Sequence, residues 1–209
     1  EIAKKVGSIF QNPKTQFFNL DSDGELSFGL ENMGIEPCLI KAKVQNTINE
    51  LDIENLKNRN VFELSGGEKQ ILAVASVYAT NPEIYVFDEP SANIDECGID
   101  KIREMLIKLK EQGKTIIISE HRLYFLVDLI DKAIYLEDGK VKHTFSNTEF
   151  ALIDNKMRKE MGLRAFTKKD NNDFVIPIEF HKTDEFVISN LNYRNNHKCV
   201  LKNINISAN

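Results

Sequence analysis

The sequence predicts an α/β fold built around a mostly parallel sheet, and three observations support this prediction. Short runs rich in β-branched residues alternate with stretches of helical length and periodicity over residues 6–145. The composition, with 42% hydrophobic and 28% charged residues, is that of an ordinary folded protein. The length of 209 residues is enough for one domain and part of another. Strands and helices that alternate in this order form a parallel sheet covered by helices.

Short apolar runs are expected to form the strands of the first domain, at residues 6–10, 84–87, 115–119, 132–136 and 140–145. Asp138 and Gly139 supply a turn between the last two of them. The helices are expected at residues 38–51, 66–80, 98–112, 122–130 and 147–162. Ser65 is a good N-cap for the second helix, and Gly113 ends the third.

A change of pattern near residue 166 predicts a domain boundary. Residues 167–173 are polar and charged and show no periodicity, so residues 166–183 are assigned to a linker. Residues 185–190 and 199–206 look like two strands joined by a polar loop at 192–197. We therefore expect one domain at 1–165 and the first strands of another at 184–209. Because the chain opens and closes on apolar runs, we also expect both domains to continue beyond it.

Charge and cysteine content exclude several classes of protein. The sequence has 27 Lys and Arg against 32 Asp and Glu, a net charge of −5, which argues against a strongly basic nucleic-acid binder. Its three cysteines are far apart and not in metal-ligand spacing, as in a reducing compartment. No apolar run approaches the roughly 18 residues of a membrane-spanning helix.

Two adjacent carboxylates follow the apolar run that ends at Phe87. In parallel α/β sheets, ligands bind at the carboxyl ends of the strands. A phosphoryl-transfer site needs one carboxylate in the magnesium shell and another that orients or deprotonates the attacking water. Asp88 suits the first role and Glu89 the second. Taken alone, the pattern also fits a buried strand that ends in a polar turn before Pro90.

The run Ser65, Gly66, Gly67, Glu68 opens the second predicted helix. A capping box formed by Ser65 and Glu68 explains the first and last of these residues. It leaves the two glycines unexplained, because glycine in a helix costs about 1 kcal/mol relative to alanine. Close approach of a phosphate to the free amides of a helix N-terminus would explain them.

Two further polar residues follow predicted strands. His121 comes after the run that ends at Ser119 and could bond a terminal phosphate, although a lone histidine is more often a surface residue. Gln11 follows the first strand and could bind magnesium or water through its amide oxygen, or simply lie in a loop. The run Gly113-Lys114-Thr115 is not a phosphate-binding P-loop, because it leads from helix into strand.

Taken together, these runs in this order resemble the nucleotide-binding domain of ABC-type ATPases from the Q-loop onward. The resemblance covers about residues 6–145 and implies a P-loop NTPase-like fold, with helices on both faces of the sheet and a helical subdomain at about 24–80. The A-loop and P-loop of that family have no counterpart ahead of Gln11 in this sequence. The chain alone is therefore expected to be inactive.

The resemblance also implies roles for individual residues and two cofactors, ATP and Mg²⁺. The catalytic residues would be Glu89, His121 and Gln11, and Asp88 with Gln11 would hold Mg²⁺. ABC-type domains close head to tail on a second ABC domain, in the same chain or in a dimer. The nucleotide-binding residues would be the signature residues Ser65, Gly66, Gly67 and Glu68, the D-loop Asp95, and Tyr193.

Within that family, residues 10–13, 16–18, 28–32 and 118–122 look like the energy-coupling-factor group, which imports vitamins and metal ions. Residues 186–206 resemble the opening strands of another such domain, with Tyr193 as the aromatic that stacks on adenine, although a hairpin tyrosine without a ligand is the plain alternative. The resemblance implies a transmembrane coupling subunit, a substrate-binding membrane component and a place on the cytoplasmic face of the membrane. Phe17, Phe18 and Phe28 are then candidate contacts, or ordinary core.

Two other functions remain open on the sequence. A soluble tandem ABC protein acting on ribosomes or nucleic acid is disfavoured by the acidic balance and by the lack of a basic arm, so no nucleic acid is expected as a partner. An ABC-like domain kept only as a scaffold is disfavoured because Glu89 and His121 are intact.

Overall fold

A computed structural model describes residues 2–92, 94–167, 186–195 and 198–208 of the chain. Contacts divide it into two units, Glu1–Asp170 and Asn171–Asn209, which are described separately below. Most of the linker predicted at 166–183 lies outside the described residues.

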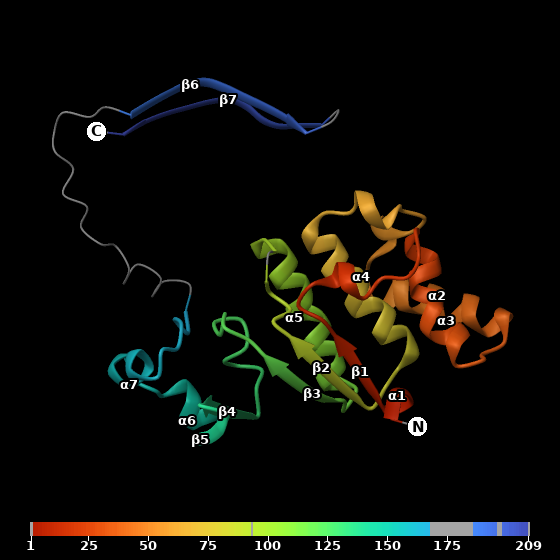
Figure 1. Cartoon of the computed structure of the whole chain (residues 1–209), viewed down its shortest axis with the longest axis horizontal. Coiled ribbons are helices and arrows are strands. Elements are labelled where there is room, and N and C mark those ends of the chain that lie inside the picture. Colours follow the sequence, from red (N-terminus) through yellow and green to blue (C-terminus); the bar gives the residue numbers. More distant parts are fainter. Residues whose placement is uncertain (1, 93, 168–185, 196–197, 209) are drawn as a thin grey trace. The chain divides into compact units, whose positions relative to one another are not determined.

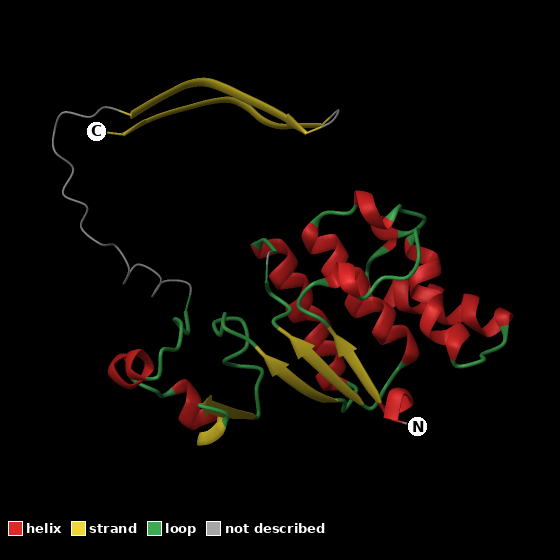
Figure 2. Ribbon diagram, in the orientation of Figure 1, coloured by secondary structure: helices red, strands yellow, loops and turns green. Residues whose placement is uncertain are grey.

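The sheet of the first unit is parallel, as predicted. Its strands β1 (Val6–Ile9), β2 (Ile84–Asp88) and β3 (Thr115–Ser119) lie in the order β1-β2-β3, with Val6 opposite Ile84 and Ile84 opposite Thr115. The arrowheads in Figure 2 lie together, so the three carboxyl ends form one edge of the sheet. The next residues of the chain, including Gln11, Glu89 and His121, follow these three ends.

Helices cover this sheet and build a separate helical region. They are α1 (Ile2–Lys5), α2 (Ser22–Asn32), α3 (Pro37–Leu51), α4 (Gly66–Thr80) and α5 (Glu96–Glu111), with 3-10 turns η1 (Pro13–Thr15), η2 (Glu54–Leu56) and η3 (Val61–Glu63). In Figure 1, α2, α3 and α4 gather on one side of the sheet. The sequence prediction did not include α2, whose N-cap is Asp21; its side chain accepts from the N–H of Gly24 at 2.8 Å.

One apolar core joins these elements. Glycine at position 7 lets β1 lie against α4, because a Cβ there would meet the side chain of Val77 and would lie 2.9 Å from the ring of Pro82. Tyr85 and Phe87 of β2 and Leu72 of α4 are almost completely buried. Burial of this kind stabilises by about 25 cal/mol for each Å² of apolar surface removed from water. The core therefore fixes α4 against the strand that ends at Asp88.

The helix predicted at 122–130 is wrong, because the segment forms a series of turns. Side chains from other elements donate hydrogen bonds to several of the carbonyl groups that would accept backbone N–H bonds in a helix. Arg103 Nη1 donates to the carbonyl of Phe125 at 2.6 Å, and Lys110 Nζ donates to that of Leu129 at 2.6 Å. Asn147 Nδ2 donates to the carbonyls of Val127 and Ile130, both at 2.9 Å. The segment keeps local backbone bonds to the carbonyls of Leu123 and Leu126, but side chains of distant residues bond the carbonyls between and after them, so no continuous helix forms.

The single helix predicted at 147–162 is also wrong, since two short helices, α6 (Asn147–Ala151) and α7 (Asn155–Glu160), replace it. Ser146 caps α6, and the side chain of Asp154 accepts from the N–H of Met157 at 2.7 Å to begin α7. An Asp inside a periodic stretch favours a new N-cap over continuation of the helix.

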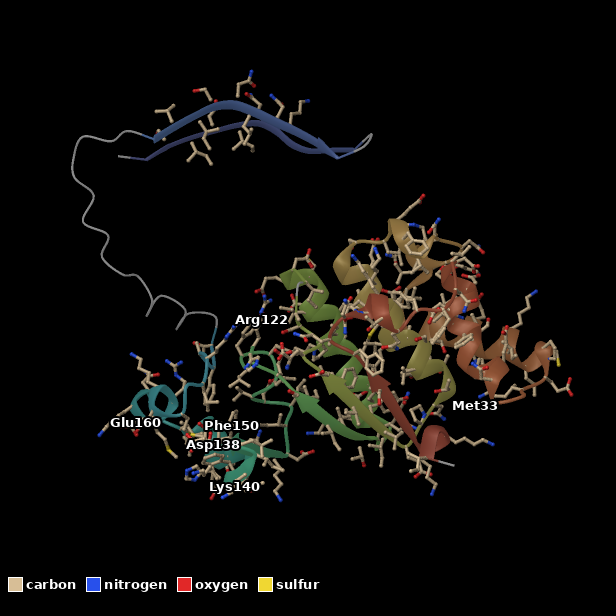
Figure 3. The ribbon with its side chains drawn as sticks, viewed as in Figure 1. Met33, Arg122, Asp138, Lys140, Phe150 and Glu160 are labelled. Carbon is tan, nitrogen blue, oxygen red and sulfur yellow. The ribbon has the colours of Figure 1, made fainter. Side chains whose placement is uncertain are left out.

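A hairpin precedes α6, as predicted. Strands β4 (Lys132–Glu137) and β5 (Lys140–Ser146) pair antiparallel. Phe150 of α6, labelled in Figure 3, packs on Phe145 of β5 with ring centroids 6.1 Å apart. Among the helices of the described part of the chain, none has the length and apolar character needed to span a bilayer.

The second unit is an antiparallel pair, β6 (Phe186–Asn195) and β7 (Lys198–Ala208). The polar loop predicted at 192–197 is wrong for its first four residues, which belong to β6. Asparagine side chains make this possible: Asn192 Oδ1 accepts from the N–H of Asn203 at 2.9 Å, and Asn205 Oδ1 accepts from the N–H of Asn190 at 2.8 Å. These bonds satisfy backbone groups where the strand register shifts.

Candidate functional site

Three side chains from the loops after β1, β2 and β3 meet at the carboxyl edge of the sheet. Gln11 Nε2 donates to Glu89 Oε2 at 2.8 Å, and His121 Nε2 lies 3.1 Å from Glu89 Oε1. The His121 side chain is 70% exposed and that of Glu89 is 28% exposed. One carboxylate therefore stands between an amide and an imidazole, within reach of solvent and of an incoming ligand.

The backbone of Glu89 is held in an unusual conformation. Its φ is +42°, in the left-handed region that a non-glycine residue seldom adopts, and Pro90 follows it. Its N–H donates to the carbonyl of Ser119 at 2.9 Å, and its carbonyl accepts from the N–H of Ala92 at 3.0 Å. Such backbone costs about 1–3 kcal/mol and persists only where the surroundings hold it, often at functional sites.

Asp88 is the last residue of β2 and is exposed, with Ser119 as its neighbour on β3. Magnesium usually takes one or two carboxylates and completes its shell with water and phosphate oxygens. The donors fit this pattern, because Gln11 donates to Glu89 through Nε2 and so keeps its amide oxygen as a ligand. Across the described residues, no cluster of three or more His, Cys, Asp or Glu side chains could hold a metal ion.

The N-terminus of α4 has the capping box expected from the sequence. The N–H of Glu68 donates to Ser65 Oγ at 3.2 Å, and Glu68 Oε2 accepts from the N–H of Ser65 at 2.7 Å. Burial raises the pKa of Glu68, but the bonds from Ser65 and the nearby Arg59 guanidinium outweigh it, so the pKa lies below its ordinary value. The capping carboxylate is therefore charged at neutral pH.

Replacing Glu68 by glutamine is expected to lower the free energy of unfolding at pH 7 by about 1 kcal/mol, the usual worth of a cap. Since the folded pKa is lowered, this stabilisation is present above the ordinary value of 4.5 and is lost as pH falls through the folded pKa. Urea unfolding at several pH values checks the result. The exposed neighbour Glu63, changed to glutamine, is the control, and a difference for Glu68→Gln that persists in acid would contradict the assignment.

The packing around α4 does not explain why residue 67 is a glycine. A Cβ at this position would lie 3.7 Å from Asp95 Oδ1 and 4.0 Å from the Cα of Gly98, which is ordinary contact. A residue with a Cβ would therefore fit here, and packing within the described chain does not require glycine. Gly66 is exposed in the same turn. The expectation that something approaches the glycine backbone stays a prediction.

Asp95 has a clear structural role as the N-cap of α5, where its side chain accepts from the N–H of Gly98 at 2.9 Å. It also lies beside Gly67, so the loop after β2 reaches the start of α4. Ser91 in the same loop is 1% exposed, and its hydroxyl has no partner within the described residues. Buried polar groups without a partner are uncommon in native proteins.

Tyr193 lies in β6, opposite Leu201 of β7, in the second unit. The sequence pattern placed it in the polar loop at 192–197, whereas the structure has it within the strand. Its proposed stacking on adenine remains a prediction.

Sequence reasoning missed side chains that hold the site together. Gln16 Oε1 accepts from the N–H of Phe10 at 3.2 Å, and its Nε2 donates to the carbonyl of Ala73 on α4 at 3.2 Å. Glu120 accepts from the N–H of Ser91 at 3.2 Å. The bonds of Gln16 to Ala73 and of Glu120 to Ser91 join residues far apart in sequence, so no local spacing predicts them.

The run at 113–115 behaves as the sequence predicted. Gly113, with φ +72°, follows α5, and Lys114 leads into β3. It is a helix-to-strand turn.

Comparison with known proteins finds similarity to ABC transporter ATP-binding proteins. Residues 1–92 match the profile of the family described as ABC transporter. A "Putative ABC transporter ATP-binding protein" of Treponema denticola is 40% identical over 216 residues, covering 100% of this chain and 44% of that protein. The "Energy-coupling factor transporter ATP-binding protein EcfA" of Methanocaldococcus jannaschii is 33% identical and covers 95% of this chain and 73% of that protein.

A solved structure agrees with these relatives. The structure titled cbiO1 from Clostridium perfringens, "Part of the ABC transporter complex cbiONQ", superposes with a TM-score of 0.65 at 31% identity, over 74% of this chain and 61% of that one. The chain spans less than half the length of the first curated relatives, at 44% and 43%.

Proposed function

Because the chain belongs to the ABC transporter family and has its ATPase cassette fold, we propose that it is part of an ATP-hydrolysing subunit that drives a membrane importer of the energy-coupling-factor type. The observation that carries the hydrolytic part is the meeting of Gln11, Glu89 and His121 at one edge of the sheet. The relatives' names support the transport part.

Each of the three residues has a chemical task in this proposal. Glu89 takes the proton of the attacking water, since its carboxylate stands at the carboxyl end of β2 with one oxygen near Gln11 Nε2 and the other near His121 Nε2. His121 donates toward the terminal phosphate and holds Glu89 in place. Gln11 orients the carboxylate through Nε2 and offers its amide oxygen to magnesium or water. When bound, Mg²⁺ neutralises charge on the phosphates, with Asp88 as its carboxylate contact.

In this proposal the candidate residues serve two different nucleotides, one for each of two domains. Gln11, Asp88, Glu89 and His121 serve the ATP of the first domain, whose P-loop is not among the 209 residues. Ser65, Gly66, Gly67 and Glu68 face the ATP of a second ABC domain, and Tyr193 belongs to that second nucleotide. Asp95 lies beside Gly67, so it is near both the loop that carries Glu89 and the residues that face the second nucleotide.

The chain alone is expected to bind Mg-ATP weakly and not to hydrolyse it, because it contains no loop that could wrap the β- and γ-phosphates. Calorimetry of the 209-residue chain with Mg-ATP checks this, with phosphate release by the full-length protein as the positive control. Micromolar binding by the chain alone would contradict the division of the site. A full-length protein without ATPase activity would overturn the proposed function.

The helical region offers a surface for the membrane partners. A groove of about 560 Å³ lies between α2 and α3. Near the start of α2, Phe18 is 74% exposed and stacks on Phe28 with ring centroids 4.7 Å apart, while Phe17 packs on the core. The stacked pair presents aromatic surface that a partner can bury. In this proposal Phe18 and Phe28 contact the transmembrane coupling subunit, and the substrate-binding component binds elsewhere in the complex.

Changing Phe18 to aspartate is expected to reduce co-purification of the membrane partners by about tenfold, since a charge replaces an apolar contact, while ATP binding is unaffected. Pull-down of the tagged full-length protein from detergent-solubilised membranes measures this. Leu152, which is 82% exposed at the end of α6, changed to aspartate is the matched control. Equal loss in both variants, or no loss in either, would remove Phe18 from the interface.

A further inference from the structure

The carboxylate of Glu120 joins two loops of the candidate site. Its Oε1 accepts from the backbone N–H groups of His121 and Arg122 at 2.8 and 2.9 Å. Its Oε2 accepts from the backbone N–H of Ser91 at 3.2 Å, 29 residues away in sequence. One side chain therefore connects the loop that carries Glu89 with the loop that carries His121.

The loop that carries Glu89 depends on such support because its backbone is strained. Glu89 has φ +42° in front of Pro90, where a relaxed chain would adopt extended geometry. The amide of Ser91 is in a residue that is 1% exposed, so water has little access to replace a lost acceptor. The bond from the Glu89 N–H to the carbonyl of Ser119 is another tie between the two segments.

We infer that Glu120 is a positioning residue for the hydrolysis proposed above: by tying Ser91 to the His121 loop, it keeps the Glu89 carboxylate between Gln11 and His121. In the described contacts its carboxylate bonds only backbone N–H groups, so it acts through its neighbours. Arg122, labelled in Figure 3, adds a weaker tie between the same segments, with Nη1 3.4 Å from the carbonyl of Ile94. The inference rests on the proposed function.

A simpler role for Glu120 would be a local cap for residues 121 and 122. The substitution Glu120→Gln distinguishes this role from the positioning role. Glutamine has the same length and keeps one oxygen for the amides of His121 and Arg122. Its NH₂ group would face the N–H of Ser91, donor against donor, so only the bond between the loops is lost. Glu120→Ala removes both sets of bonds.

The test uses the full-length protein and two measurements. Hydrogen exchange resolved at single amides is expected to become about ten- to a hundredfold faster at Ser91 in both variants, and at His121 and Arg122 only in Glu120→Ala. In both variants kcat for ATP hydrolysis is expected to fall about tenfold or more, with Mg-ATP affinity changed by less than about threefold. Asp128→Asn is the matched control, since it removes a carboxylate bonded to Arg103 in the same segment.

Each outcome decides the inference. Unchanged exchange at Ser91 in Glu120→Gln shows that the bridge does not hold the loop. Faster exchange with unchanged kcat overturns the positioning role, and an equal fall of kcat in Asp128→Asn assigns the effect to general loosening. A wild-type protein that hydrolyses no ATP contradicts the proposed function, and exchange at Ser91 still reports separately on the bridge.

Discussion

Replacing Glu89 by glutamine is expected to slow ATP hydrolysis by the full-length protein roughly 10²- to 10⁴-fold, the usual contribution of a general base. Glutamine keeps the size of the side chain and can still bond Gln11 and His121, so the site should remain assembled. It cannot accept a proton from water at neutral pH. Affinity for Mg-ATP should therefore stay within a few-fold of the wild type.

The measurement is single-turnover phosphate release together with equilibrium binding of Mg-ATP. Glu83→Gln is the matched control, because Glu83 is an exposed carboxylate just before the same strand and lies away from the carboxyl edge. Equal loss of binding and turnover, or unchanged turnover, would remove Glu89 from the role of base. A similar loss in Glu83→Gln would point to a general effect on β2.

Replacing Ser65 by arginine is expected to reduce nucleotide binding at the site that contains Tyr193 by about ten- to a hundredfold. The larger side chain fills the space above the first turn of α4 and displaces the terminal phosphate, and bonds to a charged group are worth about 1.5–3 kcal/mol. The site that contains Glu89 should keep its nucleotide. Photolabelling of the full-length protein with an ATP analogue, resolved by domain, measures the two sites.

Two variants separate this effect from a loss of helix stability. Ser65→Ala removes the cap without adding volume and should weaken binding much less. Ser146 caps α6 with Glu149 in the same box geometry, so Ser146→Arg reproduces the damage to a helix start at a place without nucleotide. If labelling falls equally in both domains, or only in the domain with Glu89, the head-to-tail assignment is wrong.

Much of the first unit was predictable because its signals are local. The run of residues 115–119 is a strand with the predicted bounds, and the capping pattern at Ser65 and Glu68 begins α4 where expected. The helix predicted at 122–130 failed for a reason that is not local. Residues 122–130 have apolar periodicity, yet Arg103, Lys110 and Asn147 take their carbonyl groups, and nothing in the segment itself reveals this. Asn192 reads as a loop residue until its partner on β7 is known.

The candidate site shows the same division. Gln11, Glu89 and His121 could be chosen from the sequence because each follows an apolar run, and parallel strands bring their carboxyl ends to one edge. The roles of Gln16 and Glu120 could not be predicted, since each bonds a backbone group on a distant element. Residue type and position relative to a strand predict which side chains lie at the carboxyl edge of the sheet. They do not predict which side chains fix the loops.

The turns at 122–130 have a consequence for how the chain reaches its native state. Helix α5 has its own N-cap at Asp95 and 16 residues of regular bonds, so it can begin to form from nearby residues alone. The turns need more than nearby residues: N–H groups inside the segment bond some of its carbonyl groups, but the donors for the others reside on α5 and at the start of α6. The segment that follows His121 is therefore expected to be complete only when α5 and α6 are packed beside it.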